Sequence, residues 1–140
     1  MYHLLAIVIG AFMAIMIPMN GILSEMTGIY KGSVLIHIIG FIGIIIVLFM
    51  NKEKIEFQKG IPMYLYSAGA IGVFTVLFIS MSFSSLGVSL TIALSLLGQS
   101  VTSIVVDHFG LLGMKIMKFE QKKLIGLSLI ASGIIVMTIF

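Results

Sequence analysis

The polar residues best suited to binding chemistry lie along one face of an apolar segment at 84–106. At 100° per residue, seven small or polar positions fall within an arc of about 120°: Ser84, Gly87, Thr91, Ser95, Gly98, Gln99 and Thr102. Such a face either packs closely against another helix or lines a cavity. Gln99 favours the cavity, since lipid satisfies neither the donors nor the acceptor of its carboxamide. The predicted substrate-cavity residues on this segment are Thr91, Ser95, Gln99 and Thr102.

The first apolar segment holds a second polar site, at Pro18 and Asn20. Proline has no N–H, so Pro18 is expected to kink a helix or leave a carbonyl without its donor. A broken helix with a carboxamide nearby is a recurrent way to build a transporter site. Asn20 therefore joins the predicted cavity. A plain proline kink with Asn20 as a local cap is the alternative.

Three ionisable residues are candidates for a gate or for ion coupling: Asp107, Glu25 and His37. Asp107 ends the polar segment, where the alternative is an interfacial carboxylate that meets water or a nearby lysine. Glu25 and His37 fall near the opposite membrane face. A loop carboxylate and an interfacial histidine are the ordinary expectation there, and a Glu–His pair is the less common one.

Catalytic and metal-binding motifs are absent from the sequence. It has no HExxH, no GxSxG and no glycine-rich phosphate loop followed by lysine. Eleven methionines could suggest a soft-metal path, but they are not clustered with cysteine or histidine, and the chain has no cysteine. We expect neither enzymatic activity nor a metal or cofactor.

The elements that position these residues must lie in lipid. Of 140 residues, 60% are hydrophobic and only 9% are charged, and the mean hydropathy is +1.26. Soluble domains carry roughly 25% charged residues, so this chain cannot cover a water-facing surface. The composition excludes a cytosolic enzyme, a nucleic-acid-binding protein and a disordered regulator. The lipid bilayer is therefore an expected partner of this chain.

Five runs are long enough for helices that cross the roughly 30 Å of membrane hydrocarbon. They predict an all-α membrane protein, a single transmembrane domain over 1–140 with spans at about 2–23, 32–50, 61–82, 84–106 and 124–140. The runs are continuous rather than alternating, which favours helices over strands. The weakest boundary is 81–87, which carries no charge. Residues 61–106 are nevertheless too many for one span.

Small residues elsewhere predict close helix contacts, because they let two backbones approach. They are Gly40 with Gly43, Gly69 with Gly72, and Gly126 with Ser132 and Gly133. Whether these contacts lie within one subunit or between subunits stays open.

Lysine placement predicts the orientation. One side of a five-span protein would hold Lys52, Lys54, Lys59, Lys115, Lys118, Lys122 and Lys123, and the other side only Lys31. Positive charge is enriched in cytoplasmic loops. We therefore expect the N-terminus inside and the C-terminus outside.

Residues 87–113, GVSLTIALSLLGQSVTSIVVDHFGLLG, resemble the YdcZ-like family, whose five-span (EamA-like) members belong to the drug/metabolite transporter (DMT) superfamily. The matching positions are Gly87, Thr91, Gln99 and Asp107, with support from Pro18-x-Asn20. The resemblance implies a half-size secondary transporter of the bacterial inner membrane. It would move a small metabolite or lipophilic compound by alternating access. Its cavity would lie between this five-helix repeat and an inverted second five-helix subunit.

The lysine bias favours a separate, oppositely biased paralogue as that second subunit, and a dual-topology homodimer is the alternative. The small multidrug resistance proteins of the same superfamily carry a carboxylate deep in their first helix. Here that helix has no acidic residue before Glu25, so proton coupling by that route is not expected. The competing function is a non-transporting membrane assembly protein whose polar face is a packing seam.

Overall fold

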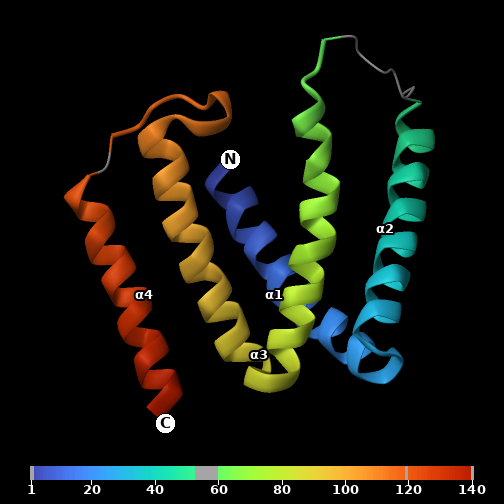
Figure 1. The fold of residues 1–140 in the computed structure, drawn as a ribbon, viewed down its shortest axis with the longest axis horizontal. Coiled ribbons are helices and arrows are strands. Elements are labelled where there is room, and N and C mark those ends of the chain that lie inside the picture. The colour runs from blue at the N-terminus through green and yellow to red at the C-terminus, as the bar shows by residue number, and fades with distance from the viewer. Residues whose placement is uncertain (1, 53–59, 119, 140) are drawn as a thin grey trace. The chain divides into compact units, whose positions relative to one another are not determined.

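The computed structural model describes residues 2–52, 60–118 and 120–139, and their regular structure is helical throughout (Figure 1). The α-helices are α1 (Tyr2–Thr27), α2 (Ile29–Asn51), α3 (Ala68–Phe109) and α4 (Gln121–Ile139). Short 3-10 helices, η1 (Met63–Ser67) and η2 (Leu111–Gly113), precede α3 and follow it. Four segments are long and apolar enough to cross a membrane. The prediction of an all-α membrane protein is confirmed at this level.

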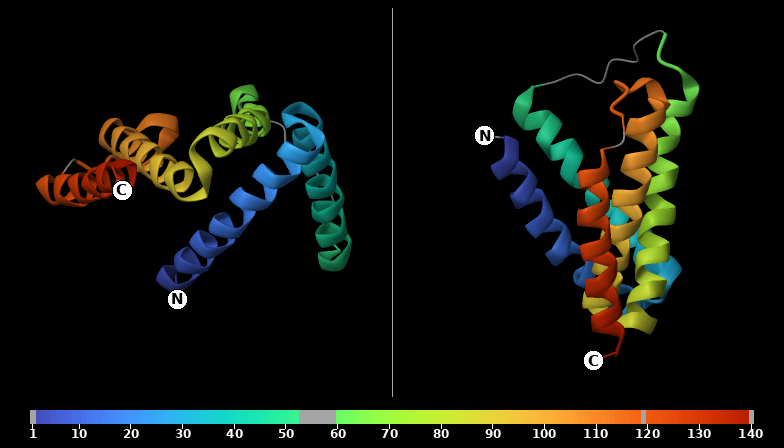
Figure 2. Two further views of the ribbon diagram at one scale, coloured as in Figure 1. Left: turned by 90° about the horizontal axis from the view of Figure 1, so that it is seen from below. Right: turned by 90° about the vertical axis from the view of Figure 1, so that its left-hand side faces the viewer.

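The break between the first two helices is much shorter than the predicted one at 24–31. It consists of Gly28 alone, with φ 91° and ψ 144°. The Gly28 N–H donates to the Ser24 carbonyl at 2.8 Å, and the Gly32 N–H donates to the Gly28 carbonyl at 2.8 Å. Glu25 and Lys31 therefore lie inside helices, because charged side chains do not end a helix and a glycine at positive φ does. Figures 1 and 2 show α1 and α2 meeting where they join and separating toward their other ends.

Most of the predicted third and fourth spans lies in the 42-residue segment α3, which is interrupted at Gly87, while residues 61–67 of the predicted third span precede α3. A straight helix of that length would measure about 63 Å, twice the thickness of the hydrocarbon layer. At Gly87 the backbone adopts φ 74° and ψ −178°, which is not helical. This interruption ends the uncharged stretch 81–87, so the weakest sequence boundary is where the helix is broken.

The lysine-rich connections are described only in part. Residues 53–59, which include Lys54 and Lys59, lie outside the described residues. The connection from α3 to α4 is shorter than the predicted 107–123, because α3 continues to Phe109 and α4 begins at Gln121. Its tight turn uses positive φ at Gly110 (61°), Leu112 (60°) and Gly113 (76°).

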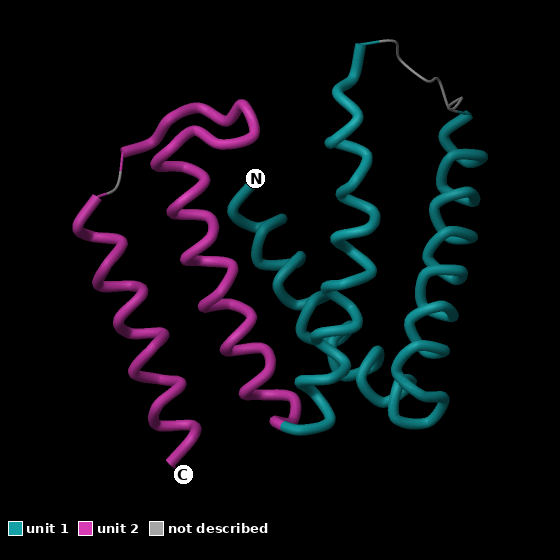
Figure 3. The backbone as a smooth tube through the Cα atoms, viewed as in Figure 1, with its two compact units in different colours: residues 1–85 teal, residues 86–140 magenta. Residues whose placement is uncertain are grey.

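The chain divides into two compact units, Met1–Ser85 and Leu86–Phe140, each described here by itself (Figure 3). Large apolar side chains are exposed along every α-helix. Among the described residues the buried hydrophobic side chains are Ile17 and Phe83. This pattern fits helices whose outer surfaces meet lipid rather than water.

Candidate functional site

The first unit is organised around small side chains where three helical segments converge. Ser24 Oγ of α1 donates a hydrogen bond to Ser80 Oγ of α3 at 3.0 Å. Both serines are buried, with 2% of their surface exposed. In an apolar environment this bond satisfies two hydroxyls that would otherwise be costly to bury.

Glycines let the helices approach at this junction. A Cβ added to Gly21 would overlap the ring of Phe83, and a Cβ added to Gly32 would lie 2.9 Å from Ser24 Oγ. Close approach over small residues is the usual basis of helix association in lipid. We name Gly21, Ser24, Gly32, Ser80 and Phe83 the serine junction.

Sequence reasoning missed the serine junction. It placed Ser24 in a loop and Ser80 near a span boundary, so neither was weighed as a buried group. The spacing Gly21-x-x-Ser24 was the signal available. The predicted glycine contacts lie elsewhere: an added Cβ meets nothing within 4 Å at Gly40, Gly43, Gly69, Gly72, Gly126 and Gly133. Contacts of these glycines with another subunit stay a prediction.

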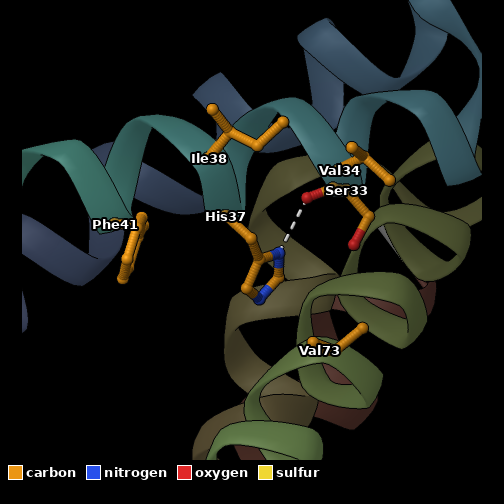
Figure 4. A pocket seen from close by; sticks show the side chains of 6 residues that line it. All are labelled: Ser33, Val34, His37, Ile38, Phe41 and Val73. Atoms are coloured by element: carbon orange, nitrogen blue, oxygen red, sulfur yellow. Dashed lines mark hydrogen bonds between the residues drawn. The ribbon is translucent and has the colours of Figure 1, made fainter.

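A groove of about 330 Å³ lies beside the junction, between α2 and the first part of α3 (Figure 4). Its lining residues are Ser33, Val34, His37, Ile38, Phe41 and Val73. The half-buried His37 ring places Nδ1 2.7 Å from the Ser33 carbonyl oxygen. Because a carbonyl only accepts hydrogen bonds, Nδ1 carries the proton. No Glu25–His37 pair forms in the described structure, where Glu25 is exposed.

The break at Gly87 changes the predicted polar face. Ser84 lies before the break and donates to the Met81 carbonyl at 3.3 Å. A helical wheel does not continue across non-helical dihedrals, so the arc that included Ser84 and Gly87 is wrong at those two positions. After the break, Thr91 is buried, with 3% of its surface exposed and no partner for Oγ1 in the described part of the chain.

Further along α3 the polar face becomes more exposed. Ser95 is half-buried, while Gln99 and Thr102 are exposed. Within the described ranges the Gln99 carboxamide has no hydrogen-bond partner. Neighbouring Ser100 instead donates to the Leu96 carbonyl of its own helix at 2.7 Å. The substrate roles of Thr91, Ser95, Gln99 and Thr102 stay predictions.

Asp107 forms an ion pair at the end of the polar segment. Its Oδ2 lies 3.6 Å from Lys123 Nζ of α4, and both side chains are about one-third exposed, at 28% and 34%. This contact agrees with the alternative interpretation of Asp107 as an interfacial carboxylate that meets a nearby lysine. A role of Asp107 as a gate stays a prediction. The Asp107 carbonyl also accepts from the Met117 N–H at 2.8 Å, which ties the α3–α4 connection back onto α3.

In α1 the helix continues through Pro18 to Thr27. The proline cannot donate to the Ala14 carbonyl four residues earlier. Asn20 is half-buried one position before the serine junction. It belongs to the first unit and Gln99 to the second, so their shared cavity stays a prediction. Among the described residues, no three His, Asp or Glu side chains lie close enough together to hold a metal ion.

Residues 1–136 match the sequence profile of the family described as "Putative inner membrane exporter, YdcZ". The chain belongs to the YdcZ family. The match covers all the predicted spans except the last four residues of the fifth, and it confirms the resemblance carried by residues 87–113. Together with the apolar helices, YdcZ membership makes this a multi-pass inner-membrane protein of an exporter family. Comparison with curated proteins and with solved structures found no match.

Proposed function

We propose that this YdcZ-family chain is one half of a secondary transporter, which exports a small metabolite or lipophilic compound by alternating access. The observation that carries the proposal is the unpartnered carboxamide of Gln99. It lies 12 residues after Gly87 and 10 before Phe109, or about 18 Å and 15 Å along a helix. Gln99 is therefore near the middle of an apolar segment.

A carboxamide at that depth needs polar company. An unsatisfied polar group in hydrocarbon costs several kcal/mol, so Gln99 must meet water in a cavity or a group from another subunit. Water and groups of another subunit are both available to Gln99 if the exposed face with Gln99 and Thr102 borders a cavity shared with a second subunit. In this proposal Ser95, Thr91 and Asn20 complete the polar lining.

The five-span topology belongs to the same proposal. Residues 68–86 and 88–109, on either side of Gly87, are each close to the ~20 residues that cross a bilayer. With α1, α2 and α4 they give five spans and termini on opposite sides. The lysine distribution supports an N-terminus inside. The partner is then an inverted five-helix subunit, with a paralogue favoured over a second copy.

Transport measurements with Gln99 variants test the function. Gln99→Ala and Gln99→Glu are reconstituted in proteoliposomes with the partner, and uptake of tetraphenylphosphonium, a lipophilic cation, is measured. We expect at least a tenfold loss of uptake with folding and assembly intact. Ser128→Ala is the control, since Ser128 is exposed and bonded to the Ile125 carbonyl of its own helix. Loss of assembly without any solute movement by the parent protein would favour the assembly-protein alternative.

Cysteine labelling tests orientation and partner together. The chain has no cysteine, and Met26 and Met117 are exposed at 81% and 56%. Met26→Cys and Met117→Cys are labelled in intact cells with an impermeant maleimide, before and after permeabilisation. External labelling of position 26 alone supports one orientation and a separate partner. Labelling of both positions in about half of the molecules would support an antiparallel homodimer.

A further inference from the structure

A second groove, of about 300 Å³, lies in the second unit between α3 and α4. Figure 3 shows α4 running alongside the part of α3 that follows Gly87. Ser100, Ser103 and Ile104 line the groove from α3, and the other lining residues come from α4. In a bilayer such a space is occupied, since an empty one would forfeit van der Waals contacts along both walls. We name this space the α3–α4 groove.

The α3–α4 groove has a charged end and an apolar interior. Lys123 lies in the first turn of α4, whose 19 residues measure about 28 Å, close to the thickness of the hydrocarbon layer. A helix of that length places its first turn at the level of the lipid head groups. Leu127 and Ile130, which also line the groove, follow one and two turns deeper on the same face of α4. This order of groups matches an amphiphile with a charged head and an apolar chain.

Lys123 retains the capacity to bind a second anion. Its side chain is 34% exposed, and its Nζ lies 3.6 Å from Asp107 Oδ2. That distance exceeds the roughly 2.7–3.2 Å of an N–H···O hydrogen bond, and an ammonium has three donors. The ion pair therefore leaves Lys123 able to donate to another oxygen. Ser103, one turn before Asp107, places a hydroxyl on the opposite wall of the groove.

The surrounding charge favours an anionic head group. Residues 107–123 contain four lysines and two acidic residues, Asp107 and Glu120. Lys115, Lys118 and Lys122 are exposed, so they add positive potential around the charged end of the groove. Basic pockets between transmembrane helices are recurrent binding sites for the head groups of anionic lipids.

We propose that the α3–α4 groove binds an anionic phospholipid. The lipid phosphate would accept hydrogen bonds from Lys123 Nζ and Ser103 Oγ. One acyl chain would lie along Leu127 and Ile130. The inference concerns lipid binding and does not depend on transport by the Gln99 cavity.

Lipid binding to the purified full chain tests the proposal. Native mass spectrometry from detergent micelles counts bound phosphatidylglycerol and bound phosphatidylcholine with identical acyl chains. Both lipids carry a phosphate, but only phosphatidylglycerol has a net negative charge. We expect phosphatidylglycerol to bind about fivefold more tightly, the effect of one lysine near an anionic lipid. Glycerol 3-phosphate, which has the charge without the chains, should not compete.

Variants of the ion pair distinguish lipid binding from a structural role. Lys123→Gln should remove the preference for phosphatidylglycerol. Asp107→Asn breaks the same ion pair but keeps the ammonium and removes a competing anion, so it should maintain or raise binding. Lys122→Gln is the control with the same change in charge. Because Lys122 is exposed and outside the groove lining, this variant should lower binding far less.

A second pair of variants tests the groove itself. Gly126 lines the groove, so Gly126→Leu should fill part of it and lower the binding of both lipids. Gly133→Leu is the control, at a position of α4 outside the groove lining. An added Cβ meets nothing within 4 Å at either glycine. Since leucine also favours a helix more than glycine does, both variants should fold.

The proposal is overturned if the two lipids bind equally well or if glycerol 3-phosphate competes. It is also overturned if Lys122→Gln or Asp107→Asn lowers binding as much as Lys123→Gln, or if Gly126→Leu leaves binding unchanged. Specific phosphatidylglycerol binding without tetraphenylphosphonium transport would contradict the proposed function and leave this site standing. Transport lost in Gln99 variants, without a preference for phosphatidylglycerol, would do the reverse.

Discussion

The two units of this protein bury polar groups in different ways. The first unit pairs Ser24 with Ser80 in a junction held together by Gly21 and Gly32. In the second unit, Thr91 is buried among the described residues and the polar side chains farther along α3 are exposed. The first unit therefore joins two of its helices through a buried hydroxyl pair, although Ser33 Oγ has no partner among the described residues. In the second unit the buried Thr91 Oγ1 has no partner among the described residues.

Membrane physics explains why this difference matters. Lipid is as apolar as leucine, so helices associate through close packing and hydrogen bonds rather than through a hydrophobic driving force. The serine junction supplies both, and we expect it to dominate the stability of the chain. The second unit holds the Asp107–Lys123 pair at its end and the unpartnered Gln99, which suits a surface completed by a partner.

The largest expected effect comes from filling the serine junction. Gly21→Leu would force a side chain into the ring of Phe83 and should lower the free energy of unfolding by about 3 kcal/mol. Gly10→Leu on the same helix is the control, because an added Cβ there meets nothing within 4 Å. Unfolding in mixed micelles measures both. Equal stability of the two variants would remove the junction from its central role.

The second-largest effect on stability is expected at Gly87, where α3 is interrupted. At φ 74° and ψ −178°, Gly87 occupies a region that is essentially restricted to glycine. Gly87→Ala should cost about 2 kcal/mol in unfolding free energy through backbone strain alone. Gly72→Ala, at a helical position of α3 with open space around it, should be nearly neutral. A neutral Gly87→Ala would show that α3 continues as a helix through this position.

A smaller effect is expected for the serine pair itself. Ser24→Ala or Ser80→Ala leaves one buried hydroxyl unpaired and should cost about 1 kcal/mol. The double variant should be more stable than the sum of the single effects predicts, since it removes both hydroxyls. A double-mutant cycle by chemical unfolding gives the coupling. Strict additivity would mean that the bond contributes nothing.

The smallest effect is expected for the ion pair of the second unit. Lys123 and Asp107 are both about one-third exposed and 3.6 Å apart, so Lys123→Ala should lower stability by no more than about 0.5 kcal/mol. The effect should shrink further at high salt. Lys122→Ala removes a neighbouring charge that forms no ion pair in the described structure and serves as the control. A loss as large as that of Ser24→Ala would show that the second unit depends on this pair.

Much of the architecture could be predicted because it depends on local chemistry. Long apolar runs identify helices in lipid, and the uncharged stretch 81–87 located the interruption of α3 to within a few residues. The boundaries at 24–31 were wrong because Glu25 and Lys31 read as a loop, although neither residue prevents a helix. Within 24–31 only Gly28 interrupts the helix, through its positive φ.

The features of the candidate site likewise separate into those that the sequence predicts and those that it does not. Sequence alone determined the membrane class, the helices and the polarity of Gln99, since each follows from hydropathy or from the hydrogen-bonding needs of one side chain. Only the tertiary structure decided that Ser24 forms a hydrogen bond with Ser80 and that Gly21 packs against the ring of Phe83. It also decided that His37 and the buried Ser33 line a groove. Ser24 and Ser80 are 56 positions apart in the sequence, and Gly21 and Phe83 are farther apart still. The existence of these contacts depends on how helices cross, which no periodicity within a single helix encodes.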